Sequence, residues 1–233
     1  MTALPYRTAL IVGAGPGISA SLARALRARG MDVAVAARNV EKLKPLAAEI
    51  GLHAFRVEAS NADSVAELFR AVSERIGDID VVAYNAAARV RGSLLELDTA
   101  AVQTALLVGA FGGFLVAQQA ALRMVPRGQG AILFTGATAS IKGFAESAAF
   151  AMGKFALRAL AQSAARELGP KGIHVVHFII DGAVRSAALA QLGDQPDSTL
   201  DPDAIAQSYL DALGQPRSAW SMEVELRPWV ERF

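Results

Sequence analysis

The first residues able to do chemistry form a glycine-rich turn near the start of the chain. A short apolar run ends at Val12 and is followed by Gly13, Gly15 and Gly17, and an amphipathic helix pattern begins at Ile18. Glycines let the backbone turn tightly and approach a pyrophosphate, which the free N–H groups and the dipole of a helix N-terminus stabilise. This arrangement of strand, glycine turn and helix predicts a dinucleotide-binding site, with a glycine-rich turn of another kind of α/β protein as the alternative.

A basic residue stands where a second apolar run ends. Arg38 directly follows the run at 32–37, and none of positions 36–38 is Asp or Glu. A site selective for NAD(H) usually has a carboxylate there for the ribose 2′-hydroxyl, whereas a guanidinium pairs with a 2′-phosphate. The sequence therefore favours NADP(H) over NAD(H), and the alternative is a solvated arginine at the end of a strand.

The elements that must position these residues alternate along the whole chain. Short, nearly continuous apolar runs alternate with helix patterns, which is typical of a parallel sheet covered by helices on both faces. No linker or repeat interrupts the pattern, so we expect one doubly wound α/β domain over 1–233 with about seven strands. The predicted strands lie at 8–12, 32–37, 53–58, 79–84, 131–135, 173–180 and 222–226, and the predicted helices begin at 18 or span 40–50, 61–76, 98–124, 147–168 and 203–213.

This fold class predicts where a ligand would bind. In doubly wound sheets ligands lie beyond the carboxyl ends of the strands, so four loops should share one pocket: 13–19, 85–91, 136–147 and 181–195. The last predicted strand alternates apolar and acidic residues, which indicates an edge strand with Glu223 and Glu225 on its outward face.

Composition removes several classes of function. The 233 residues include no cysteine, which excludes disulfides, zinc–thiolate sites and thiol catalysis, and the three scattered histidines make a metal site unexpected. The net charge is +1 without a basic block, so no nucleic-acid partner is expected. Apolar stretches are interrupted short of the ~18 residues that a membrane span needs, and the N-terminal run is too short for a secretory signal. We expect a cytoplasmic protein that does not bind membranes.

From residue 7 to about 186 the sequence resembles the short-chain dehydrogenase/reductase family. Gly13 and Gly17 match glycines of the family's TGxxxGxG turn, and Asn85 begins an Asn-Ala-Ala segment similar to its NAG motif. Lys154 aligns with the lysine of its YxxxK motif. The resemblance implies a Rossmann-like fold, a nicotinamide cofactor, and a substrate loop and helix at about 183–215.

The resemblance also implies cofactor contacts. Glu58 takes the place of the family's adenine-binding Asp, Asn85 would lie on the adenosine side, and Ser186 would touch the nicotinamide carboxamide. Lys154 would hold the ribose. The expected cofactor-binding residues are Gly13, Gly15, Gly17, Ile18, Arg38, Glu58, Asn85, Lys154 and Ser186.

The catalytic positions depart from the family pattern. Family members reduce a carbonyl or oxidise an alcohol with a Tyr hydroxyl, and the lysine one helical turn later lowers the pKa of that Tyr from ~10. Here Phe150 replaces the Tyr, Ala137 the Ser and Leu106 the helix Asn. A phenyl ring has no proton to give, so of these four positions only Lys154 keeps its chemistry.

Two further residues are candidates for the missing chemistry. Thr138, beside Ala137, would hydrogen-bond the substrate, and the alternative is an ordinary loop hydroxyl. Asp181 stands at the family's Pro position before Gly182 and would titrate usefully if desolvated, and the alternative is a turn-forming aspartate. The candidate catalytic residues are Lys154, Thr138, Asp181 and the position of Phe150.

Two functions remain open. The first is an NADP(H)-dependent oxidoreductase acting on a small carbonyl or alcohol through a degenerate active site. The second is a catalytically inactive dinucleotide-binding sensor or scaffold of the same fold. For either, the resemblance implies a homodimer or homotetramer packed through helices 98–124 and 147–168, which are rich in small and apolar residues.

Overall fold

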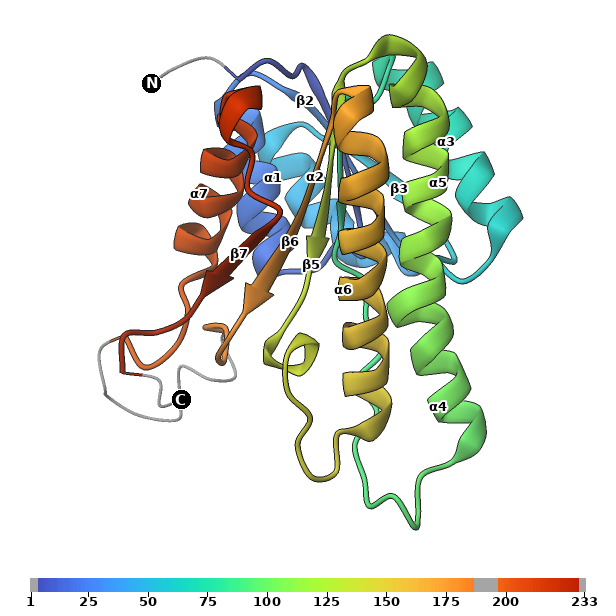
Figure 1. The fold of residues 1–233 in the computed structure, drawn as a ribbon. Coiled ribbons are helices and arrows are strands. Elements are labelled where there is room, and N and C mark those ends of the chain that lie inside the picture. The colour runs from blue at the N-terminus through green and yellow to red at the C-terminus, as the bar shows by residue number, and fades with distance from the viewer. Residues whose placement is uncertain (1–3, 187–196, 231–233) are drawn as a thin grey trace.

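All seven predicted strands form one parallel sheet in the computed structural model, which describes residues 4–186 and 197–230 (Figure 1). Their order in the sheet is β3-β2-β1-β4-β5-β6-β7, so the chain moves outward from β1 to β3 and then returns to β1's other side. This reversal leaves a ligand crevice at the ends of β1 and β4. The strands are β1 (Thr8–Val12), β2 (Asp32–Ala37), β3 (His53–Arg56), β4 (Val81–Tyr84), β5 (Gly130–Thr135), β6 (Ile173–Ile180) and β7 (Glu223–Leu226).

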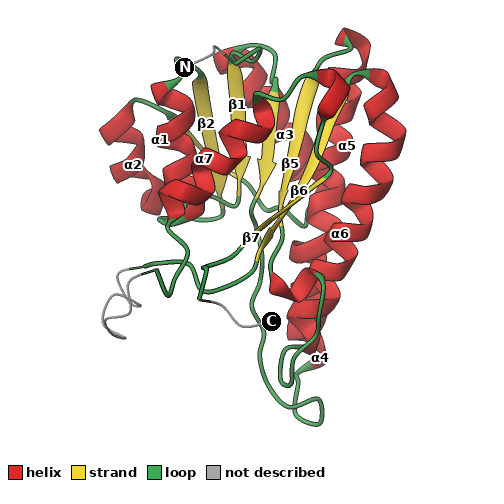
Figure 2. Ribbon diagram, turned by 60° about the vertical axis from the view of Figure 1, so that its left-hand side comes forward, coloured by secondary structure: helices red, strands yellow, loops and turns green. Residues whose placement is uncertain are grey.

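Helices cover both faces of this sheet, as Figures 1 and 2 show. Side chains alternate along each strand, so Ile11 of β1 packs into the core on one face and Leu10 into the core on the other. The prediction of a single doubly wound α/β domain is confirmed. One face carries α1 (Ile18–Ala28), α2 (Lys44–Ile50) and α7 (Pro202–Leu213), and the other carries α3 (Ala62–Ile76), α4 (Thr99–Leu106), α5 (Gly112–Met124) and α6 (Ala148–Leu168).

The helix predicted over 40–50 is divided in the structure. A 3₁₀ turn spans Val40–Leu43, and α2 begins only at Lys44. Pro45 lies in the first turn of α2, where its missing N–H costs nothing, whereas inside a longer helix it would break the ladder.

The helix predicted over 98–124 also has an irregular segment. Between α4 and α5 the residues Leu107–Phe111 form a π-helical turn. The continuous stretch Thr99–Arg127 is long and apolar enough to cross a membrane by length and composition alone, which we did not expect from the sequence. This is weak evidence for a span, because 44% of its most apolar window is buried in the protein and core helices pass the same test.

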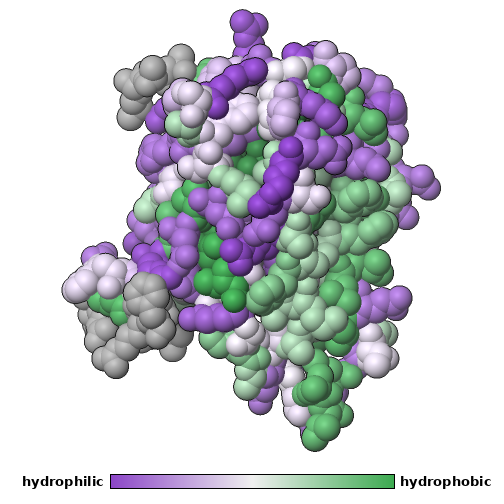
Figure 3. Space-filling model, in the orientation of Figure 1, coloured by the Kyte–Doolittle hydropathy of each residue, from purple (hydrophilic) through white to green (hydrophobic). Residues whose placement is uncertain are grey.

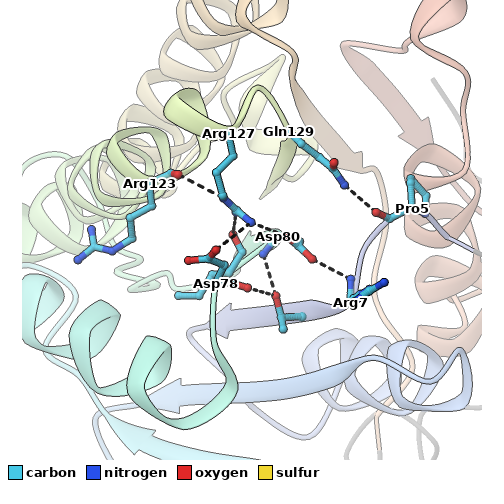
Figure 4. Close-up of polar contacts among 9 residues, drawn as sticks. Pro5, Arg7, Asp78, Asp80, Arg123, Arg127 and Gln129 are labelled. Carbon is cyan, nitrogen blue, oxygen red and sulfur yellow. Dashed lines mark hydrogen bonds and ion pairs between the residues drawn. The ribbon is translucent and has the colours of Figure 1, made fainter.

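A polar cluster joins the sheet to the end of α5 at the edge opposite the predicted pocket (Figure 4). The Asp80 carboxylate accepts the backbone N–H of Arg7 and an N–H of Arg127, both at 2.8 Å. Arg127 also donates to the carbonyl oxygen of Ile79 at 2.7 Å. These bonds satisfy a largely buried carboxylate at the amino ends of β1 and β4.

The last strand is an edge strand as predicted, but one of its acidic residues faces inward. β7 pairs only with β6, and Glu225 is exposed. Glu223 instead accepts two hydrogen bonds from the Arg158 guanidinium on α6, at 2.5 and 3.0 Å. Its carboxylate also lies 3.5 Å from Nδ1 of the buried His177. The outward assignment of Glu223 is wrong because α6 supplies a cationic partner on that face.

Candidate active site

Gly13 shapes the turn after β1. Its φ of +83° lies in the left-handed region, and a Cβ there would come within 2.2 Å of the backbone nitrogen of Ala86. The N–H groups of Gly13 and Ala14 both donate to the carbonyl oxygen of Ala36 in β2, at 2.9 and 3.0 Å. Gly13 is not among the residues that line the cleft described below, so it acts by bending the backbone.

Gly15, Gly17 and Ile18 line the cleft at the N-terminus of α1. A Cβ added at Gly15 or Gly17 would meet no atom within 4 Å, so the backbone here is open to a ligand. Gly17 caps α1 without a side-chain hydrogen bond, and the first turn of α1 has no acidic residue. Uncapped N–H groups and the helix dipole therefore favour an anion, and the turn fits the pyrophosphate of a dinucleotide.

Asn85 connects the end of β4 to this turn. Its side-chain amide donates to the Ser19 hydroxyl at 2.6 Å, and its backbone N–H donates to the carbonyl oxygen of Val12 at 2.8 Å. Asn85 also lines the cleft. Its side chain therefore holds the first helical turn of α1 beside β4.

The cleft lies beyond the carboxyl ends of the central strands and has a volume of about 1030 Å³. It is lined by the turn after β1 and by residues after β4, β5 and β6, including 182–186. The four loops predicted to share one pocket do so, within the residues that the structure describes. Residues 187–196 of the fourth loop lie outside that part of the chain, and no residue of α7 lines the cleft.

Lys154 is the buried cation of this cleft. Lys154 is only 4% exposed, and its ammonium donates a hydrogen bond to the carbonyl oxygen of Thr135 at 2.6 Å. Burial, together with the nearby positive charge of Arg89, lowers the pKa of Lys154 to about 8. The lysine is therefore close to titrating at neutral pH.

Phe150 lies one helical turn before Lys154 and faces the same cleft. The ammonium of Lys154 is 5.8 Å from the centre of its ring, and the guanidinium carbon of Arg89 is 5.4 Å from it. Two cations thus surround an aromatic ring that has no proton to exchange.

One more catalytic candidate, Thr138, lines the cleft at the end of β5 beside Ala137, the residue aligned with the family's Ser. Thr138 opens the 3₁₀ turn Thr138–Ser140. Ala137 has no hydroxyl, whereas Thr138, which also lines the cleft, has one.

Leu106 does not occupy the position that we assigned to it. It lines neither the cleft nor the narrow recess beside it, where Lys154 is joined instead by Ala105 and Gly109. A π-helical turn begins at the residue after Leu106 and contains Gly109, so regular helical spacing does not predict which residue there lies beside Lys154. Neither Ala105 nor Gly109 carries an amide, so the helix supplies no relay group there.

Asp181 does not face the cleft, contrary to the expectation that it would act there. It is 3% exposed, and its carboxylate lies 3.1 Å from the guanidinium of Arg227. Its backbone N–H donates to the carbonyl oxygen of Leu226 at 2.8 Å. These contacts bind the end of β6 to the last residue of β7 and to Arg227 after it, and the sequence around Asp181 contains no sign of them.

The remaining cofactor candidates lie outside or at the rim of the cleft. Arg38 is exposed directly after β2 and does not line it. Glu58 is also exposed and accepts a hydrogen bond from the Ser60 hydroxyl at 2.9 Å. Ser186 lines the cleft at the end of the segment that follows β6.

From the sequence, Arg89 and Arg91, just past Asn85, are possible contacts for an anionic substrate, and the commoner alternative is a pair of solvated loop arginines. The contact of Arg89 with Phe150 depends on how the loop after β4 lies against α6, which is a tertiary feature.

Comparisons with known proteins agree with this geometry. A family model for short-chain dehydrogenases matches residues 7–197. A short-chain dehydrogenase from Rhodopseudomonas palustris is 38% identical, with 96% of this chain and 99% of that one covered and a TM-score of 0.82. The chain belongs to the short-chain dehydrogenase family of oxidoreductases.

Two further relatives span nearly the same length. An alcohol dehydrogenase from the archaeon Thermococcus sibiricus, solved with 5-hydroxy-NADP, is 27% identical, with 97% and 98% coverage and a TM-score of 0.86. An uncharacterized oxidoreductase of Staphylococcus aureus is 28% identical over 98% of this chain and all of its own.

Proposed function

We propose that the protein is an NADP(H)-dependent oxidoreductase that interconverts a small carbonyl compound and its alcohol, with Lys154 exchanging the proton in place of the family tyrosine. This proposal rests on the position of the Lys154 ammonium. The group is buried at the cleft beside Phe150 and donates a hydrogen bond to the carbonyl oxygen of Thr135. Its pKa of about 8 suits acid–base work, because a general acid is most effective when its pKa lies near the working pH.

The residues of the cleft fit the cofactor. The turn of Gly15, Gly17 and Ile18 would hold the pyrophosphate, because it combines open backbone with an uncapped helix N-terminus. Arg38 would pair with the 2′-phosphate from its exposed position after β2. When bound, the nicotinamide supplies the hydride or accepts it. The Thermococcus complex with 5-hydroxy-NADP and a 25% identical metagenomic oxidoreductase in complex with NADP support this choice.

The other cofactor assignments follow the family resemblance. Asn85 would contact the adenosine side, Glu58 the adenine and Ser186 the nicotinamide carboxamide. Lys154 would hold the ribose with the N–H groups that Thr135 does not use. Thr138 would hydrogen-bond the substrate from the cleft wall.

Lys154 would move the proton directly. In the reducing direction one N–H stays on the carbonyl oxygen of Thr135 while another passes its proton to the substrate oxygen. The resulting neutral amine takes a proton from water. In the oxidising direction the neutral amine accepts the proton of the substrate hydroxyl.

This role predicts opposite pH dependences for the two directions. The reduction rate should fall as pH rises through about 8, because the ammonium is the acid, and the oxidation rate should rise. Initial rates with NADPH and with NADP⁺ from about pH 6 to about pH 10 measure both. Lys154→Met should lower each rate by about 10²- to 10⁴-fold. Unchanged turnover in that variant would contradict the mechanism.

A second function is favoured by one specific observation. Phe150 and Ala137 give the cleft no side-chain hydroxyl at two of the altered catalytic positions, and Gly109 in the recess beside it has no side chain, which suits a dinucleotide-binding sensor or scaffold. A fluorescence titration with NADPH and separately with NADH, followed by turnover on a panel of carbonyl compounds, separates the two functions. NADPH binding with turnover supports the oxidoreductase, NADPH binding without turnover supports the sensor, and absence of binding contradicts both.

A further inference from the structure

The ionisable side chains that line the cleft all carry the same sign of charge. Within the described part of the chain they are Arg89, Arg91, Lys154 and Arg185, and no Asp or Glu lines it. The whole protein has 23 basic and 22 acidic side chains, so the positive charge in this cleft is a local concentration of one sign. A pocket lined by one sign of charge attracts ligands of the opposite sign.

The four cations differ in what already balances them. Arg185 pairs with Asp201 at 2.7 Å, and the buried Lys154 donates to the carbonyl oxygen of Thr135. Arg89 and Arg91 are exposed, and no carboxylate among the described residues lies within ion-pair distance of either. The Arg89 guanidinium rests 5.4 Å from the centre of the Phe150 ring. Arg89 therefore has donors left for a ligand.

Arg89 also lies at the chemical end of the cleft. It contacts Phe150, and its charge acts on Lys154, whereas the turn at Gly15 and Gly17 belongs to the pyrophosphate end. None of the proposed cofactor contacts uses the Arg89 guanidinium. A planar guanidinium held against an aromatic ring presents its remaining N–H groups as a fork that matches a carboxylate or a phosphate.

We propose that Arg89 binds an oxyanion of the substrate, so that the protein acts on carbonyl compounds or alcohols bearing a carboxylate or phosphate group. This inference rests on the proposed function and names the substrate class of the same site. Arg89 is a specificity-determining residue, and Phe150 holds its guanidinium in place through the ring contact.

The charges couple binding to chemistry. Arg89 is one of the two causes that lower the pKa of Lys154. An anion bound to Arg89 offsets the positive charge of that side chain, so substrate binding should raise the pKa of Lys154. A substrate with the oxyanion would thus favour the ammonium form that reduction needs, whereas a neutral carbonyl would not.

The test is a calorimetric titration of the NADPH-loaded protein with matched pairs of ligands. The carboxylate arm uses pyruvate, acetoacetate and levulinate against their methyl esters, and the phosphate arm uses glyceraldehyde 3-phosphate against glyceraldehyde. We expect at least one anion to bind about tenfold or more tighter than its neutral partner. The arm in which this occurs identifies the oxyanion. Equal affinity in every pair would overturn the proposal.

Variants assign the effect to the residue. Arg89→Gln should remove the preference for the anion, and Arg89→Lys should restore part of it. Lys142→Gln is the matched control, because Lys142 is an exposed cation near Phe144 that does not line the cleft. An anion preference retained in Arg89→Gln, or lost equally in Lys142→Gln, would contradict the role of Arg89.

This experiment separates the inference from the proposed function. Binding of an anion that depends on Arg89, without NADPH oxidation, supports the substrate site and contradicts the oxidoreductase. NADPH oxidation with equal rates on acids and esters supports the oxidoreductase and contradicts the substrate site. NADPH affinity, measured by fluorescence for each variant, verifies that the cleft remains formed.

Discussion

At the scale of single residues, Phe150 presents to the cleft a phenyl ring that has no proton to exchange. Lys154 and Arg89 lie 5.8 and 5.4 Å from the centre of this ring. In the proposed mechanism the acid is therefore Lys154, the buried group whose pKa is suited to it. Native activity on neutral aldehydes and ketones should accordingly be low.

Restoring the hydroxyls should create that activity. Phe150→Tyr combined with Ala137→Ser returns the two groups that family members use, and Lys154 is already in place to lower the pKa of the new Tyr. We expect measurable NADPH oxidation with neutral ketones, followed by absorbance. Phe150→Leu combined with Ala137→Ser is the control that lacks the phenol. Failure of the first pair to exceed the control would mean that more of the cleft has diverged.

At the scale of elements, two glycines of one turn should respond differently to the same substitution. Gly13→Ala forces a Cβ against the backbone of Ala86 at a left-handed φ, so it should destabilise the fold by at least about 2 kcal/mol. Gly15→Ala meets no neighbour and should leave stability nearly unchanged while weakening NADPH binding. Denaturant unfolding and the NADPH titration measure the two effects. Equal unfolding midpoints for both variants would refute this division of roles.

His177 of β6, the strand that contacts both α6 and β7, should make the free energy of unfolding depend on pH. His177 is fully buried, and burial lowers its pKa from 6.5 to about 4. Between these values the unfolded chain holds a proton that the folded chain does not, so stability falls as pH drops through this window. The effect is at most about 3 kcal/mol. His177→Gln cannot titrate and should lose this dependence.

Denaturant unfolding at about pH 7 and about pH 4.5 tests this expectation. The two free energies of unfolding should differ less in His177→Gln than in the native protein. The pKa of Glu223 is also lowered, chiefly by its hydrogen bond to Arg158, so this group adds a loss of stability at still lower pH. An unchanged difference in His177→Gln would show that other groups carry the dependence.

At the scale of the whole molecule, large apolar side chains are exposed along the π-helical turn Leu107–Phe111, α5 and α6 (Figure 3). We propose that a second copy of this chain covers them, giving a homodimer or homotetramer, because large exposed apolar patches are rare on monomers. The large apolar residues exposed there are Leu107, Phe111, Phe114, Leu122, Met152 and Phe155.

Charge on this face should separate the subunits. Phe155→Glu and Met152→Glu each place a carboxylate where the proposed contact is apolar, so the mass from light scattering should fall towards 24.4 kDa. Leu95→Glu is the matched control, since Leu95 is 94% exposed on the loop before α4. A mass unchanged by all three variants would place the contact elsewhere, and a native monomer would reject the proposal.

The sequence by itself determined the elements and their order. Strands such as Ile173–Ile180 and the glycine turn after Val12 appear as local patterns, because burial on both faces requires continuous apolar runs and a tight turn requires glycine. The resemblance to the family's YxxxK motif identified Lys154 and Phe150, and residues four apart share one helical face.

Only the tertiary structure decided which charges meet. Arg158 and Glu223 are 65 residues apart in the sequence, and Asp181 and Arg227 belong to different segments. Arg89, on the loop after β4, contacts the ring of Phe150 in α6. Such pairs leave no periodic trace, because a side chain's partner depends on how helices and loops pack across the sheet. Local sequence fixes backbone conformation, whereas the environment of each ionisable group is set by distant parts of the chain.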